Sequence, residues 1–274
     1  MNRALLGKAF LDGRWMLLGC ALLMFAFHWL FVWITKLIPM DTLMSMFADL
    51  PPWIQSLPGI ELKELFTYEG RIAMAYLEPV TLLASAAWGV SRGSDAVSGE
   101  IGRGTMELVL AQPVRRIAVL GAQMTVMTLG AAVIALAAWL GTAIGLATVD
   151  LGVIVPVSTY IPSAINLFAL TFFVAAASTL ASSFDRYRSR TIGLVVSIYI
   201  VQYVIKLMAR MVDEWNWMMY VTFHGAYQPQ VMAVGPERAW ELSLRFDGLL
   251  ILLGVVSFAI AAAIFCRRDL PAPL

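Results

Sequence analysis

The chain has 274 residues, of which 60% are hydrophobic and 14% are charged, and its mean hydropathy is +0.79. Soluble domains are about half apolar and a quarter charged, so this composition indicates an integral membrane protein. The net charge of +1 argues against a nucleic-acid-binding protein, and two Cys and two His without a zinc-ligand spacing argue against a metal centre or a disulfide framework.

Six apolar runs are long enough to cross a membrane as helices, since a bilayer core about 30 Å thick requires roughly 20 apolar residues. The first run is longer than a signal-peptide core and is followed by Pro39-Met40-Asp41 instead of a small-residue cleavage site, so we expect it in the mature protein. We predict an all-α membrane protein with a single domain over residues 1–274. The expected spans are residues 15–38, 72–91, 117–148, 160–184, 191–211 and 246–266.

The segment before the first span combines basic and apolar side chains. Arg3, Lys8 and Arg14 alternate with an apolar set that begins at Leu5 and ends at Leu11. This spacing is typical of a helix that lies on an anionic membrane surface before the chain turns into the bilayer. We therefore expect an interfacial helix over residues 1–14.

The connection over residues 39–71 is rich in Leu, Met, Phe and Trp and is too apolar for a free linker. It is interrupted at Pro51-Pro52 and at Pro58-Gly59, and such pairs break helices. We predict short interfacial helices in this loop, on the extracytoplasmic side of the membrane.

Two ionisable residues fall inside predicted spans at similar depths. Glu78 is fourteen residues from Arg92 and Lys206 is sixteen residues from Arg190, which corresponds to about 21 Å and about 24 Å along a helix. Ionisable groups at membrane depth are usually paired or face a polar cavity. We hypothesise that Glu78 and Lys206 meet, together with Gln202; the alternative is that each side chain extends alone to the outer headgroups.

The polar connection over residues 92–116 is longer than a simple turn requires. Gly102 and Gly104 permit a sharp change of direction. Thr105 then occupies the expected N-cap position of a helix, and Glu107 in the first turn opposes the helix dipole. We predict a short helix in the cytoplasm that begins at this turn.

Arg103 has an acidic residue on either side in sequence, Glu100 three positions before it and Glu107 four positions after it. Ion pairs at these spacings are expected to hold the turn. The apolar run from Leu108 to Leu110 follows. One interpretation is a solvated turn at the membrane surface, and the other is a protruding helix that docks into a groove on another cytoplasmic protein.

Aromatic residues concentrate between the fifth and sixth spans, at Trp215, Trp217, Tyr220, Phe223 and Tyr227. This concentration is typical of a belt at the headgroup boundary, and an aromatic ligand cage is the alternative.

The histidines and two pairs of glycines are expected to serve packing. His28 has no carboxylate neighbour, so a hydrogen-bonded packing residue is favoured over a proton relay, and His224 is interpreted in the same way.

Two pairs of glycines have the G-x-x-x-G spacing, Gly89/Gly93 and Gly141/Gly145. This spacing permits close helix approach, which we expect within the chain.

Basic residues are distributed unevenly over the two sides of the membrane. Twelve of the 19 Lys and Arg, but only six of the 18 Asp and Glu, fall in the N-terminal segment, residues 92–116, residues 184–190 and the C-terminal tail. The positive-inside rule therefore places both termini and the 92–116 connection in the cytoplasm.

The 92–116 connection contains a spaced set of residues: Glu100, Arg103, Gly104, Thr105, Glu107, Leu108, Leu110, Pro113 and Arg116. This set resembles the signature of the ABC-2 type permeases, the membrane subunits of ATP-binding-cassette exporters. Val109 and Ala111 replace leucines that are common in the family. In that family the motif implies a coupling helix that contacts the nucleotide-binding subunit, so the resemblance assigns partner docking to these residues.

The resemblance further implies an exporter of the prokaryotic inner membrane that works by alternating access, with the path between two six-helix halves. The chain would then form a dimer with itself or with a sister permease. No G-x-x-x-x-G-K-[ST] phosphate loop occurs, so ATP and Mg are expected on a separate ATP-binding subunit. We expect this chain to bind no cofactor, metal or nucleic acid and to have no enzymatic activity of its own.

Two other functional classes fit the residues less well. An ion-coupled secondary transporter or channel predicts several midplane acids, broken helices and internal repeats, and only Glu78 matches. An intramembrane enzyme requires a nucleophile with a base, or metal ligands, at membrane depth, and His28 is the one histidine within a predicted span. The sequence does not indicate the cargo.

Overall fold

The computed structural model describes residues 3–235 and 237–268, and every regular element within these ranges is helical. Six helical segments are long and apolar enough to cross a membrane, which confirms the predicted fold class. The segments are α1 (Arg3–Leu37), Tyr68–Gly102, α9 (Arg116–Thr148), Val157–Phe184, which contains η3 (Val157–Tyr160) and α10 (Ile161–Phe184), α11 (Arg188–Met211) and α13 (Ala239–Arg267).

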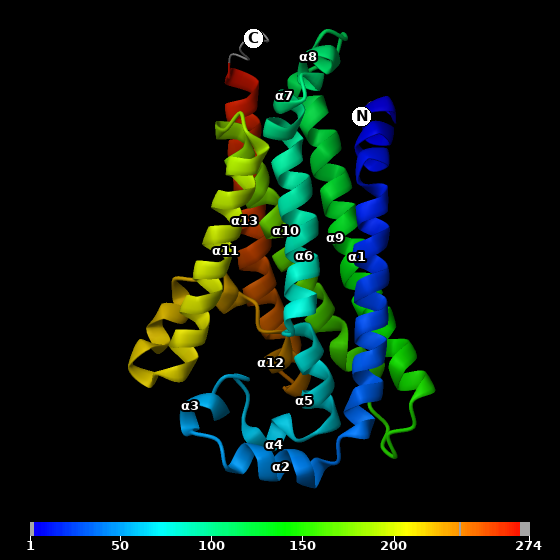
Figure 1. Ribbon diagram of the computed structural model, residues 1–274, viewed down its shortest axis with the longest axis vertical. Coiled ribbons are helices and arrows are strands. Elements are labelled where there is room, and N and C mark those ends of the chain that lie inside the picture. The colour runs from blue at the N-terminus through cyan, green and yellow to red at the C-terminus, as the bar shows by residue number, and fades with distance from the viewer. Residues whose placement is uncertain (1–2, 236, 269–274) are drawn as a thin grey trace.

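The long segments run along the long axis of the molecule (Figure 1). The start of α1, the end of α13 and the short helix α8 (Thr105–Leu110) lie together at one end, which we call the α8 end. The other end is called the cap end. It carries the cap, which consists of α2 (Met40–Ala48), α3 (Pro52–Gln55) and α4 (Leu62–Leu65).

The helices of the cap begin and end where the prolines and glycine predict. Pro51 is the N-cap of α3 and Pro52 is its first residue, so α2 and α3 are separate helices. Gly59 has a φ of 70°, in the left-handed region that glycine adopts at little cost. The predicted breaks in the 39–71 connection are therefore confirmed.

The first helix differs from the prediction. α1 runs without interruption from Arg3 to Leu37, so residues 3–14 are not a separate helix. Gly13 lies against the side chains of Trp88 and Arg92, which belong to the second segment. This packing within the bundle keeps the N-terminal turns aligned with the rest of α1, and the interfacial position of these residues stays a prediction.

The second segment is a series of helices: α5 (Tyr68–Ala73), η1 (Met74–Tyr76), α6 (Pro79–Ser94), the π-helical η2 (Asp95–Gly99) and α7 (Glu100–Gly102). Glu78 is extended, with ψ 145°, because the residue before a proline is excluded from the helical region. The interruption between η1 and α6 follows from Pro79. At the other end the helix continues eleven residues beyond the predicted boundary at residue 91, into the segment that was predicted to be a loop.

The core is centred on α10, which packs against α6, α9 and α13. The two glycine pairs permit close packing within the chain, as predicted. A Cβ at Gly93 would lie 2.6 Å from the Ala175 carbonyl oxygen on α10, and a Cβ at Gly145 would lie 2.8 Å from Val32 on α1. Both pairs are therefore used between helices of the same chain.

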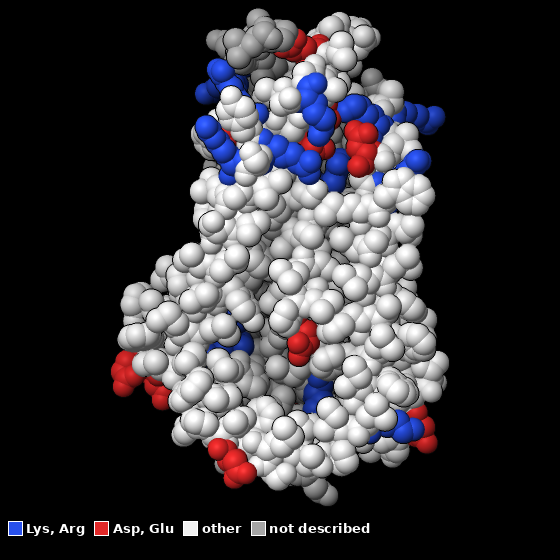
Figure 2. Space-filling model, in the orientation of Figure 1, with Lys and Arg blue, Asp and Glu red and all other residues white. Residues whose placement is uncertain are grey.

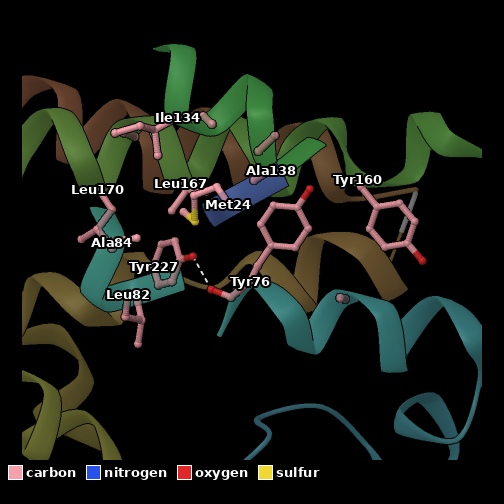
Figure 3. Packing of buried hydrophobic residues seen from close by; sticks show 14 of the residues in the cluster. Met24, Tyr76, Leu82, Ala84, Ile134, Ala138, Tyr160, Leu167, Leu170 and Tyr227 are labelled. Atoms are coloured by element: carbon pink, nitrogen blue, oxygen red, sulfur yellow. Dashed lines mark hydrogen bonds between the residues drawn. The ribbon is translucent and has the colours of Figure 1, made fainter. Parts of the chain in front are cut away.

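Buried aromatic residues fill the bundle toward the cap end. Tyr76, Tyr160 and Tyr227 lie among aliphatic side chains of the core, and the Tyr227 hydroxyl donates a hydrogen bond to the Tyr76 carbonyl oxygen (Figure 3). The chain enters the core here through η5 (Phe223–Ala226) and α12 (Pro229–Val234).

This packing corrects part of the predicted aromatic belt. Trp215, Trp217 and Tyr220 on η4 (Asp213–Tyr220) are exposed, as a belt requires, but Tyr227 is fully buried. The segment that follows η4 folds back into the bundle. The aromatic residues beyond Tyr220 therefore contribute to the core and not to a surface belt.

Both histidines are packed inside the bundle; His28 has the predicted hydrogen bond, whereas the ring nitrogens of His224 have no hydrogen-bond partner among the described residues. Nδ1 of the buried His28 lies 3.0 Å from the Met24 carbonyl oxygen, and the His28 ring packs against the ring of Tyr76. His224 is buried beside the rings of Tyr199 and Tyr203, and burial lowers its pKa to about 3.

Candidate functional site

The short helix α8 begins directly after a left-handed turn at the α8 end. Gly104 is its N-cap residue and has a φ of 68°, a conformation that costs other residues about 1–2 kcal/mol. Thr105 is the first residue of the helix, so the prediction that Thr105 caps it is wrong. The Thr105 hydroxyl donates instead to the Glu100 carboxylate at 2.6 Å. The left-handed backbone of Gly104 makes the turn, so the N-cap position is Gly104, one residue before the predicted Thr105.

The two faces of α8 have different surroundings. Met106 is buried in the core, and Leu110 packs partly against the same cluster. Glu107 and Leu108 face outward, and Leu108 is 70% exposed. Pro113, beyond the end of the helix, is also exposed. The helix is thus anchored on one side, and its other side is an exposed surface with an acidic and an apolar side chain.

Glu100 lies under the turn and is buried, with 4% of its surface exposed. Its carboxylate accepts hydrogen bonds from Lys8 Nζ at 2.7 Å and from Arg103 Nη2 at 3.2 Å. The predicted ion pair between Glu100 and Arg103 is therefore confirmed. The predicted pair between Arg103 and Glu107 is not formed, because Glu107 has no ion pair among the described residues.

Asp95 is the second acidic centre beneath α8, and it is also buried. One carboxylate oxygen lies 2.6 Å from Arg103 Nη1 and 3.6 Å from Arg188 Nε, and the other lies 3.4 Å from Arg92 Nη1. The hydrogen bond that Arg103 donates to Asp95 raises the pKa of the guanidinium above its ordinary value, so Arg103 stays charged. Arg103 thus joins Asp95 to Glu100. We call these six residues the charged base: Lys8, Arg92, Asp95, Glu100, Arg103 and Arg188.

The charged base is connected to α1, α9 and α11, and the π-helical η2, which carries Asp95, is connected to α10. Lys8 belongs to α1 and Arg188 to α11. Arg92 Nη2 donates to the Ala9 carbonyl oxygen of α1 at 3.1 Å and to Gln123 Oε1 of α9 at 3.0 Å. Ser182 of α10 accepts from the backbone N–H of Ser98 at 2.8 Å. Polar contacts therefore connect the segment beneath α8 to α1, α9, α10 and α11. A displacement of α8 can reach these four helices through them.

Arg116 contacts a different helix from the other residues of the motif. Its guanidinium donates to the backbone carbonyl oxygens of Phe265 and Arg268, at 3.4 Å and 2.5 Å. Arg116 therefore ties the start of α9 to the end of α13 and does not belong to the exposed face of α8.

The structure brings Glu78 and Lys206 to one cavity but does not pair them. Both line a cavity of about 320 Å³ at the cap end, between the cap, α6 and α11. Lys206 Nζ donates to the Tyr227 carbonyl oxygen at 2.6 Å, and neither residue forms an ion pair with a described residue. Gln202 contributes its backbone carbonyl to Thr222 and does not join them. The predicted direct contact is therefore wrong.

A buried polar network near the cap end was missed by the sequence analysis. The Asp247 carboxylate on α13 accepts hydrogen bonds from Asn166 Nδ2 on α10 and from Ser243 Oγ, each at 2.5 Å. Asn166 also bonds the backbone at Ala226 and Gln228, so the network fixes the segment that folds back into the bundle. Asp247 lies one residue inside the predicted sixth span, and this acidic residue at membrane depth could have indicated the network.

The described residues include no group of three or more His, Cys, Asp or Glu side chains that could hold a metal ion. The amino-acid sequence matches the model of a protein family described as "ABC-2 family transporter protein" over residues 12–270. A search of curated proteins finds no match to the chain.

Proposed function

Because the chain belongs to the ABC-2 family of transporter proteins, we propose that it is the permease subunit of an ATP-driven exporter. ABC-2 permeases pair with ATP-binding subunits and typically lack an ATPase site of their own. ATP and Mg are then bound by the separate subunit, and this chain supplies the membrane path. One observation carries the proposal: α8 presents Glu107 and Leu108 outward, while the charged base and η2 beneath it together contact four long helices.

The docking site is the outward face of α8. An exposed helix with an apolar side chain beside an acidic one suits a groove with an apolar floor and a basic rim. Glu107, Leu108 and Pro113 contact the partner in this proposal. Glu100, Arg103 and Thr105 hold the turn from below, and Gly104 permits the turn. Met106 and Leu110 anchor the helix in the core.

The proposed orientation places the α8 end in the cytoplasm. Basic groups form a dense band at this end, and a broad belt free of charge follows it (Figure 2). An excess of Lys and Arg on the cytoplasmic side is the general rule for multi-pass proteins. The cap then lies outside, and an inner membrane of a prokaryote is the proposed location.

Transport in this account is alternating access in a dimer of two permease chains. Each chain supplies one six-helix half, either as two copies of this chain or as this chain with a sister permease. α1, α11 and α13 carry many exposed apolar side chains along the uncharged belt, which suits contact with lipid and with a second half. ATP-driven motion of the partner displaces α8, and the charged base together with η2 passes the displacement to α1, α9, α10 and α11.

Affinity purification of the tagged chain in mild detergent tests the proposal, with mass spectrometry of the proteins that accompany it and an ATPase assay. We expect a subunit that carries a phosphate-binding loop, and we expect Glu107→Lys to reduce its recovery about tenfold, because the substitution reverses the charge on the docking face. Glu241→Lys is the matched control, since Glu241 is exposed in the first turn of α13 at the cap end.

Two results would contradict the proposal. Undiminished recovery of the ATPase with Glu107→Lys would remove α8 as the docking site. Recovery of the chain alone in several detergents, without ATPase activity, would instead favour an ion-coupled transporter or channel.

A further inference from the structure

The cap end contains basic side chains whose charge no described carboxylate neutralises. Lys206 and Arg210 are four residues apart on α11 and line the same cavity of about 320 Å³. Neither forms an ion pair with a described acidic residue. A buried ammonium without a counter-charge is costly, and such groups inside membrane proteins usually mark a binding site or a transport path.

Lys206 lines this cavity and has one hydrogen-bond acceptor among the described residues. Only 1% of its surface is exposed, and Nζ donates one hydrogen bond, to the Tyr227 carbonyl oxygen at 2.6 Å. An ammonium has three donors. The ammonium also lies 5.5 Å from the centre of the Tyr227 ring, and its other donors have no hydrogen-bond acceptor among the described residues.

Arg210 extends the same positive surface by one helical turn. Its guanidinium donates to the Leu57 carbonyl oxygen at 2.8 Å and to Gln228 Oε1 at 3.2 Å, which are both neutral acceptors. The guanidinium also lies within 2.6 Å of the position of a Cβ at Gly59, so the left-handed glycine of the cap leaves room for it. The cap thus orients Arg210 without neutralising it.

A second cavity, of about 230 Å³, adjoins the first through shared lining by Phe47, Pro58, Met74 and Glu78. It adds Arg71, which is buried and donates to the Thr35 carbonyl oxygen. The charged residues that line the two cavities are therefore three basic residues and one acidic residue, Glu78. Charged groups of both signs are visible in a hollow of this face, toward the cap end (Figure 2).

The remaining lining of both cavities is apolar, with side chains such as Phe31, Ile54 and Leu207. The volumes are comparable with small-ligand sites, which begin at about 300 Å³. Net positive charge inside an apolar wall favours a ligand that has an anionic head and a hydrocarbon tail. We propose that these cavities bind an amphiphile with an anionic headgroup, with the head at Lys206 and Arg210 and the tail along the apolar lining beneath the cap.

Binding to the purified chain tests this proposal, and it requires no ATP-binding subunit, so its outcome is independent of the proposed exporter function. Native mass spectrometry is used to titrate three probes: dioctanoyl phosphatidylglycerol, dioctanoyl phosphatidylcholine and inorganic phosphate. We expect phosphatidylglycerol to bind about tenfold more tightly than the zwitterionic lipid of equal chain length, because only its head carries net negative charge. We also expect inorganic phosphate to compete weakly, because it has no tail.

Lys206→Met should weaken phosphatidylglycerol binding about tenfold, since it removes the ammonium and keeps an apolar side chain of similar length. Arg245→Gln is the matched control, because Arg245 is an exposed cation near the start of α13 that lines neither cavity. Leu207→Trp, which fills the cavity from an apolar position, should weaken binding as well and provides a second variant if Lys206→Met does not fold.

Equal affinity for the two lipids, or unchanged phosphatidylglycerol binding in both Lys206→Met and Leu207→Trp, would overturn the proposal. Inorganic phosphate binding as tightly as phosphatidylglycerol would also overturn it, since the site would then take a free anion and not an amphiphile.

Discussion

The two ends of the molecule differ in the partners of their buried charged side chains. At the α8 end, Asp95 and Glu100 are surrounded by Lys and Arg from three different segments, and their carboxylates all have charged partners. At the cap end, Lys206 and Arg210 have only neutral acceptors among the described residues. Paired charges fix helices relative to one another. A buried charge without a charged partner can instead form a favourable ion pair with a bound ligand. The first arrangement suits the transmission of motion, and the second suits binding.

The largest expected effect is at the paired end. Asp95→Asn leaves three arginines without their shared carboxylate, and we expect the free energy of unfolding to fall by about 3 kcal/mol, the scale for loss of one member of a buried ion pair. Chemical unfolding in mild detergent measures it. Asp185→Asn is the control, because Asp185 is only half-buried and its Oδ1 accepts only backbone N–H groups, which an amide oxygen also serves. Equal, small losses in both variants would contradict the importance of the charged base.

The turn beneath α8 should show the next largest effect. Gly104→Val places a β-branched residue at φ 68°, and we expect a loss of about 2 kcal/mol in the free energy of unfolding, together with weaker recovery of the ATPase. Gly104→Asn is the control, because asparagine tolerates the left-handed region. Identical behaviour of the two variants would show that the backbone conformation of the turn does not matter.

At the cap end we expect a change of the opposite sign. Lys206→Met removes a buried cation without a carboxylate partner and should raise the free energy of unfolding by about 1–2 kcal/mol when no amphiphile is present, because the desolvation cost exceeds the value of one hydrogen bond. The same unfolding measurement, made in nonionic detergent, checks the sign. A loss as large as that of Asp95→Asn would remove the contrast between the two ends.

The smallest expected effect is a pH dependence at the cap end. Burial lowers the pKa of His224 to about 3, below its ordinary value of about 6.5, so the unfolded chain binds the proton more readily than the folded chain. This contribution to stability is complete above about pH 6.5 and is lost as the pH falls toward 3. Between pH 7.5 and 5.5 we expect a loss of about 1 kcal/mol. His224→Gln removes this part of the pH dependence, and an unchanged profile would contradict a buried neutral histidine.

The sequence predicts the six long helices and the breaks in the cap because those features depend on local properties, apolar length and proline or glycine. Residues 92–102 were predicted to be a loop because Arg92, Asp95 and Ser98 are polar. In the structure they are helical and buried, since their partners on α1, α9, α10 and α11 satisfy them. The sequence of one segment does not show which residues of other helices will be its partners.

The same limit applies to the candidate site. The residues from Glu100 to Pro113 were assigned from the family resemblance, and the ion pair of Glu100 with Arg103 was predicted because the two lie three positions apart. The contact of Lys8 with Glu100 joins residues 92 positions apart, and Tyr227 is buried only because the chain folds back after η4. These contacts depend on the tertiary arrangement, and the sequence alone does not specify them.

The central claim is that the outward face of α8 contacts an ATP-binding subunit, and photo-crosslinking in native membranes tests it most directly. A photoreactive residue replaces Leu108, and the control replaces Leu244, which is 81% exposed near the start of α13 at the cap end. We expect a cross-link from position 108 to a protein with a phosphate-binding loop and none from position 244. Cross-links from position 108 only to lipid, or equal yields of that protein at both positions, would contradict it.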